Sequence, residues 1–200
     1  MKGRPPVAGK AAKPQDRIVV SRLGLGPSLR AWRLARRIKQ GHAAELLGVS
    51  QATVSRWESG RQPPAEAEAM ALARLLAARP TSAADRELAR LVSPSRRSLH
   101  LFCDLTHTLL AASPARRRDM ATDPETLMGH SLWRHASAES VALEERLEAL
   151  GWYEPATEPI EAWTGANRSA ALAIRPGRFR ITRFQLSCGG FARLVETLGS

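Results

Sequence analysis

The chain has 200 residues, 44% of them hydrophobic, which is enough apolar material for one large domain or two small ones. Its net charge of +11 is uneven: residues 1–98 carry 19 basic and 7 acidic side chains, whereas residues 99–200 carry 11 and 12. A basic half joined to a neutral half indicates that only the first half binds a polyanion, and no apolar run approaches the roughly 20 residues of a membrane-spanning helix.

Residues 1–20 are rich in lysine, arginine and proline and poor in large apolar side chains. Such a segment cannot bury enough surface to offset its loss of conformational entropy, so the sequence predicts a disordered basic arm. The functional alternative is an arm that contacts DNA phosphates or the minor groove.

The stretch 40–58 predicts two short helices joined by a tight turn at Gly48. Glycine adopts positive φ without a Cβ penalty, and Ser50 can cap the helix that follows. The face beginning at Gln51 is polar, while Val54 and Trp57 are apolar. Two helices around a glycine turn indicate a helix-turn-helix, whose second helix, here 51–59, enters the DNA major groove.

Further helices are expected on both sides of this motif. Ser28 predicts the start of a helix over 29–37, and the loop 59–64 precedes a helix over 65–78. Together these segments predict an all-α domain of four or five helices over residues 21–79.

Six positions carry a family pattern: a glutamine opening the second helix, an alanine four positions on, the turn glycine, and Glu-x-Gly-x-x-x-Pro after the third helix. They are Gln40, Ala44, Gly48, Glu58, Gly60 and Pro64. With this pattern, the stretch from Leu29 to Leu76 resembles the Cro/phage-repressor (Xre-type, Cro/C1-type) family of helix-turn-helix transcriptional regulators.

The resemblance implies roles for individual residues. The residues implied to read bases are Gln51, Ala52, Ser55 and Arg56. Glutamine can pair with adenine, arginine with guanine, and an alanine methyl can contact a thymine methyl. The residues implied to bind phosphates are Gln40, Thr53 and Arg61.

Arg33 and Glu58 fall where the family has a structural ion pair joining its first and third helices. The chain departs from the family at Gly41-His42, where helix-favouring acidic or polar residues are usual. Glycine inside a helix costs up to ~1 kcal/mol, so this helix is expected to fray more easily.

Residues 80–98 predict a linker with a short helix over 84–92, and residues 99–200 predict an α+β domain. Helices are expected after Ser113-Pro114, after Asp123-Pro124, and from Ser137 to near Gly151. Strands are expected over 99–103, 108–112, 159–164, 170–175, 179–186 and 191–198.

Three features of this half carry a second resemblance: Asp104 in the first hairpin, Ala112-Ser113-Pro114 after the second strand, and a Gly-x-Ser segment within 127–133. With the order of strands and helices, they resemble a PAS-like sensory domain. The resemblance implies an antiparallel, cupped sheet that binds a small ligand or forms a dimer, without indicating which ligand.

The sequence gives little support for self-cleavage or for metal binding. Self-cleaving repressors need a Ser–Lys pair in the C-terminal half, and the last lysine here is Lys39. The metal-ligating candidates His100, Cys103, Asp104, His107 and Cys188 lack zinc-type spacing. We therefore expect no catalytic residues, no metal and no cofactor, and the two isolated cysteines fit a reducing cytoplasm.

The sequence thus predicts a sequence-specific DNA-binding regulator, cytoplasmic and nucleoid-associated when bound to double-stranded DNA. A homodimer is expected because one recognition helix reads few base pairs. Its C-terminal domain would dimerise or bind a small molecule or protein partner. Two alternatives remain: an antitoxin whose C-terminal domain binds a toxin, and a nonspecific nucleoid protein.

Overall fold

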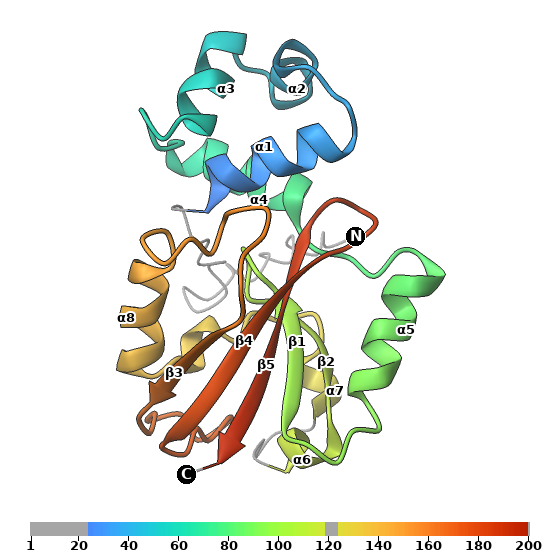
Figure 1. The fold of residues 1–200 in the computed structure, drawn as a ribbon, viewed down its shortest axis with the longest axis vertical. Coiled ribbons are helices and arrows are strands. Elements are labelled where there is room, and N and C mark those ends of the chain that lie inside the picture. Colours follow the sequence, from blue (N-terminus) through green and yellow to red (C-terminus); the bar gives the residue numbers. More distant parts are fainter. Residues whose placement is uncertain (1–23, 119–123, 200) are drawn as a thin grey trace, which may run out of the picture.

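The computed structural model describes residues 24–118 and 124–199, so the predicted basic arm over 1–20 lies outside the described residues. A helical unit is followed by a sheet unit (residues 99–199) (Figure 1). The helical unit consists of α1 (Leu25–Ala35), α2 (Gln40–Leu47), α3 (Gln51–Glu58), α4 (Glu66–Leu76) and α5 (Ala83–Val92). The predicted all-α domain with a helix-turn-helix is confirmed.

The sheet unit has the predicted α+β architecture. Its strands are β1 (Leu99–Cys103), β2 (Leu109–Ala112), β3 (Ile160–Thr164), β4 (Gly177–Gln185) and β5 (Phe191–Gly199). They form one antiparallel sheet in the order β2-β1-β5-β4-β3. Between β2 and β3 lie α6 (Pro114–Arg117), α7 (Pro124–Leu127), the 3₁₀ turn η2 (Trp133–His135) and α8 (Ala138–Arg146). This arrangement agrees with the antiparallel sheet and intervening helices that the PAS-like resemblance implies.

Helix α1 begins earlier than the sequence predicts. Its N-cap is Gly24, and Ser28, the expected cap, is buried inside the helix. The early start is possible because a proline, here Pro27, is tolerated in the first turn of a helix. It also requires glycine, since a Cβ on Gly24 would lie 2.3 Å from the Tyr153 ring, and one on Gly26 would lie 2.1 Å from the Trp57 carbonyl oxygen.

Two other predictions in the sheet unit are wrong. Residues 170–175 form an irregular segment instead of a strand, because Asn167 supplies its hydrogen bonds: the side-chain amide donates to the carbonyl oxygen of Leu172 and accepts from the Ile174 amide. Helix α8 starts at the predicted Ser137 cap but ends at Arg146, and turns continue to Gly151, which has φ +71°.

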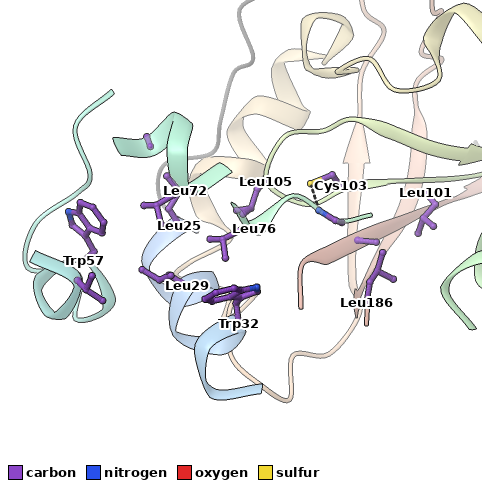
Figure 2. Close-up of a cluster of buried hydrophobic side chains, with 14 of the residues drawn as sticks. Leu25, Leu29, Trp32, Trp57, Leu72, Leu76, Leu101, Cys103, Leu105 and Leu186 are labelled. Atoms are coloured by element: carbon purple, nitrogen blue, oxygen red, sulfur yellow. Dashed lines mark hydrogen bonds between the residues drawn. The ribbon is translucent and has the colours of Figure 1, made fainter. Parts of the chain in front are cut away.

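One apolar cluster runs through both units. In the helical unit it includes Leu29, Trp32 and Leu76, and it continues into the sheet unit through Leu101 and Leu186 (Figure 2). Helix α5, which lies in the predicted linker 80–98, packs against β1 and β2. Helices α1 to α4 therefore rest on the end of the sheet with a shared hydrophobic core, and α5 lies alongside the sheet (Figure 1).

Candidate nucleic-acid interface and the cavity of the sheet unit

Helix α3 presents a polar face to solvent. Gly48 makes the turn before it, with φ +66°, and the Ser50 hydroxyl caps it by accepting from the Thr53 amide at 3.1 Å. Val54 and Trp57 are buried against the helical core. Of the residues predicted to read bases, Gln51, Ala52 and Arg56 are exposed and Ser55 is half-buried.

A chain of hydrogen bonds fixes this face to the other helices. Arg33 of α1 donates from Nε and Nη2 to the two carboxylate oxygens of Glu58, both at 2.8 Å, and from Nη1 to the Ile38 carbonyl oxygen at 2.9 Å. Gln40 donates to Glu58 Oε2 at 2.9 Å, and Gln51 donates to Gln40 Oε1 at 2.6 Å. Because the Arg33 and Glu58 side chains are only 12% and 4% exposed, solvent screens their pairing weakly.

The structure also places the predicted phosphate ligands. Gln40 is half-buried and lies between Glu58 and Gln51, so a predicted phosphate ligand contacts a predicted base reader. Thr53 bonds the Ser50 hydroxyl at 2.9 Å, and its Oγ1 accepts from Arg56 Nη2 at 3.2 Å. Arg61 is exposed just after α3.

Residues 25–89 match the model of a protein family described as "Helix-turn-helix domain". The N-terminal unit is a helix-turn-helix domain. This domain extends through α4 into α5, so the family match includes most of the helix that packs against the sheet. No curated protein matches the chain.

Solved structures are similar at low identity. One is the PAS domain of an HTR-like protein from Haloarcula marismortui, 13% identical, covering 58% of this chain and 92% of that one with a TM-score of 0.43. Another is an RNA-binding light-oxygen-voltage receptor, 12% identical, covering 90% of this chain and 59% of that one with a TM-score of 0.39.

A cavity of about 550 Å³ lies between one face of the sheet and the segments that cross from β2 to β3. Aromatic side chains line one wall: the ring centroids of His100 and Phe102 are 5.6 Å apart, those of Phe102 and His107 5.5 Å, and those of His107 and Trp133 4.6 Å. Burial, followed by the positive charge of Arg116, lowers the pKa of His100 well below its usual value, so this imidazole is neutral at pH 7. The cavity is large enough for a small organic ligand.

A buried cluster of four charges lies between this cavity and the helix-turn-helix domain. Asp104 accepts from Arg193 at 2.7 Å and from Arg183 Nε at 2.8 Å, and the Trp152 indole donates to the same carboxylate at 3.1 Å. Arg193 also donates to Glu144 Oε2 at 2.7 Å. The two carboxylates and two guanidinium groups balance, which makes their burial tolerable.

These pairings keep both acids ionised. Burial alone would raise the pKa of Glu144, but Arg193 and His107 together outweigh that effect and lower the pKa to about 2. Arg193 and Arg183 likewise outweigh burial and lower the pKa of Asp104. The same carboxylates raise the pKa of Arg193 against the effect of its burial.

Polar contacts join the sheet unit to the helix-turn-helix domain directly. Arg183 Nη2 donates to the Ser28 hydroxyl of α1 at 3.1 Å, and Arg36 donates to the Cys188 carbonyl oxygen at 2.7 Å. Asp85 of α5 accepts from the Ser187 amide at 3.1 Å and bonds the Ser187 hydroxyl. The sequence analysis did not identify Arg183 and Arg193 as functional residues. The available signal was that each is an arginine placed among apolar residues inside a predicted strand.

The metal-ligating candidates do not gather. In residues 24–118 and 124–199, no group of three or more His, Cys, Asp or Glu side chains could hold a metal ion. Cys103 and Cys188 are free thiols whose sulfurs accept from the amides of Ala78 and Arg79. No helix in this part of the chain has the length and apolar character needed to cross a bilayer.

Proposed function

We propose that the protein is a sequence-specific DNA-binding transcriptional regulator that acts as a homodimer. The observation that carries this proposal is the exposed polar face of α3, which the Arg33–Glu58–Gln40–Gln51 chain of hydrogen bonds fixes in place. A helix held in one orientation can present side chains to base edges in the major groove. The excess of basic residues in 1–98 supports attraction to DNA phosphates.

Each residue on or near this face has a proposed role. Base reading is assigned to Gln51, Ala52, Ser55 and Arg56; phosphate binding to Gln40, Thr53 and Arg61; and the structural pairing to Arg33 and Glu58. Glutamine and arginine carry the discrimination, because each pairs with a base edge through two hydrogen bonds, worth about 1–3 kcal/mol.

The sheet unit is the proposed sensor of a small molecule. Its cavity of about 550 Å³ supports this role, since ligand sites of soluble proteins have volumes in this range. The contacts of Arg183 with Ser28 and of Asp85 with Ser187 provide a physical connection between the cavity side of the sheet and the DNA-binding helices. We propose that ligand binding changes DNA affinity through this interface.

The test is selection of duplexes from a random pool by the purified full chain. We expect a recovered operator with two half-sites separated by about one helical turn, as a dimer requires. Gln51→Ala and Arg56→Ala should each relax the sequence preference while weak nonspecific binding remains. Arg146→Ala is the matched control, because it removes one exposed positive charge from α8. Equal binding to all duplexes, or an unchanged preference in both reader variants, would contradict the proposal.

A further inference from the structure

His107 is buried in the cavity wall with unsatisfied polar atoms. Its side chain lies between the rings of Phe102 and Trp133 and is 5% exposed. Within the described residues, neither ring nitrogen has a hydrogen-bond partner; the nearest carboxylate oxygen, Glu144 Oε2, is 3.7 Å from Nε2, too far for a hydrogen bond. The backbone of His107 has φ +55°, which is strained for a residue with a side chain. Unpaired buried groups and backbone strain are both typical of ligand sites.

The groups around His107 restrict what can bind there. Glu144 is ionised, so a carboxylate at this end would meet like charge. Arg193 is already bonded to Asp104 and Glu144, so it would repel a cation and has little capacity left for an anion. A hydroxyl group suits this end because it can donate a hydrogen bond to the Glu144 carboxylate and accept one from an N–H of the His107 imidazole.

The opposite end of the cavity is lined by basic side chains. Strand register places Arg178 beside Gly199, at the far end of the sheet from Arg193, which lies opposite Phe102. The Arg178 guanidinium is already paired with Glu161, so Arg178 marks the position of this end but is not the proposed anion ligand. Arg175 and Arg118 line the same cavity and are exposed. Among the described residues that line the cavity, Glu144 is the one carboxylate, and it lies at the His107 end. The end away from the helix-turn-helix domain therefore favours an anion.

Apolar side chains form much of the wall between the two ends, although His100, Arg116 and His135 also line the cavity. The apolar part includes Leu143, Leu172, Phe179, Ile181 and Val195, together with the Phe102 and Trp133 rings. A flat hydrocarbon body fits this surface, because aromatic rings gain from stacking in addition to the area that they bury.

We infer that the cavity binds a hydroxylated aromatic carboxylic acid, with its hydroxyl at His107 and Glu144 and its carboxylate at Arg175. The inference rests on the sensory role proposed above and names the ligand class of that same site. Ligand binding gives a hydrogen-bond partner to one of the two imidazole nitrogens, neither of which has one otherwise, and the anionic end neutralises part of the arginine charge at the far end.

Three naphthalene probes test the inference by calorimetry with the full chain and without DNA. They are 6-hydroxy-2-naphthoate, 2-naphthoate, which lacks the hydroxyl, and 2-naphthol, which lacks the carboxylate. We expect 6-hydroxy-2-naphthoate to bind about tenfold or more tightly than either analogue, since each missing group removes a hydrogen bond or ion pair. No binding of 6-hydroxy-2-naphthoate, or equal binding of all three probes, overturns the inference.

Two variants test which end of the cavity binds the hydroxyl of the ligand and which end binds its carboxylate. His107→Phe retains a ring of similar shape and should abolish the preference for 6-hydroxy-2-naphthoate over 2-naphthoate. Arg175→Gln should reduce the preference over 2-naphthol, whereas Arg146→Gln, outside the cavity, should leave both preferences unchanged. Unaltered preferences in both cavity variants contradict the assignment, provided that circular dichroism shows them folded. Because no DNA is present, failure here is distinguishable from failure of DNA recognition, which the duplex selection measures separately.

Discussion

Arg183 of β4 donates a hydrogen bond to Ser28 of α1, over 3.1 Å, across the interface between the sheet and the helix-turn-helix domain. The same guanidinium is bonded to Asp104 at 2.8 Å and lies 3.7 Å from the centroid of the Phe191 ring. Its position therefore depends on the buried charge cluster, and the position of α1 depends on Arg183.

Ser28→Ala removes this contact with little change in volume. We expect the free energy of unfolding to fall by about 1–3 kcal/mol, because a buried N–H of Arg183 loses its acceptor. Urea unfolding of the full chain, followed by circular dichroism, measures the change. Ser93→Ala, at an exposed position, should have a much smaller effect. An unchanged unfolding midpoint for Ser28→Ala would show that the hydrogen bond contributes nothing to stability.

Asp104→Asn tests the charge cluster itself. The substitution keeps the shape of the side chain but leaves Arg183 and Arg193 with one fewer negative charge in a buried site. Breaking a buried ion pair in this way typically costs about 3–5 kcal/mol. Thermal unfolding should show a large decrease in Tm, and Glu161→Gln, which removes an exposed acid paired with Arg178 and Arg180, is the control. Equal decreases in the two variants would argue against a special role for Asp104.

Stability should depend on pH in the acid range. Burial opposes the ionisation of Glu144, whereas Arg193 and His107 favour it, and the net effect lowers its pKa to about 2 in the folded protein. Because the unfolded chain binds this proton near pH 4.3, the stabilisation is complete above that pH and is lost as the pH falls toward 2. Unfolding free energies measured from about pH 6 to 2.5 should decrease, and Glu144→Gln should have a flatter profile. Identical profiles would rule out Glu144 as a contributor.

Gly41 and Gly48 give a matched pair of glycine substitutions in the helix-turn-helix domain. Gly41 lies inside α2, and a Cβ there would have no atom within 4 Å, so Gly41→Ala should stabilise the protein by up to ~1 kcal/mol. Gly48 has φ +66°, so Gly48→Ala should destabilise it by about 1–2 kcal/mol despite equally open space. Opposite shifts in Tm are expected. Shifts of the same sign would mean that backbone conformation does not govern these positions.

Local signals in the sequence predicted much of the fold. The Gly48 turn, the Ser50 and Ser137 caps and the Ser113-Pro114 helix start act through neighbouring residues, so they can be read without knowledge of the tertiary structure. The Ser28 cap failed because the start of α1 is set by Tyr153 and Trp57, which are distant in sequence. The strand over 170–175 failed for a similar reason, since the Asn167 side chain replaces sheet hydrogen bonds there.

The functional residues likewise divide into those that local sequence predicts and those that only the tertiary structure brings together. The residues on the face of α3 follow from helical spacing and from a family pattern in one continuous stretch. The cluster of Asp104, Glu144, Arg183 and Arg193 draws on β4, β5, α8 and the first hairpin, and only the sheet register brings these segments together. The sequence marks Asp104 as a hairpin residue, but its two arginine partners lie 79 and 89 positions away.

The apolar cluster that includes Trp32, Leu76, Leu101 and Leu186 limits how freely the two parts of this protein can be exchanged. A chimera that joins the helix-turn-helix domain to another C-terminal domain would leave the Trp32 and Leu76 faces uncovered unless the new partner offered a matching surface. Gly189 and Gly190 add a steric requirement, because a Cβ at either would lie within 2.6 Å of Trp32 or of the Leu76 carbonyl oxygen. The helical unit and the sheet unit of this chain are therefore expected to change together in evolution and in engineering.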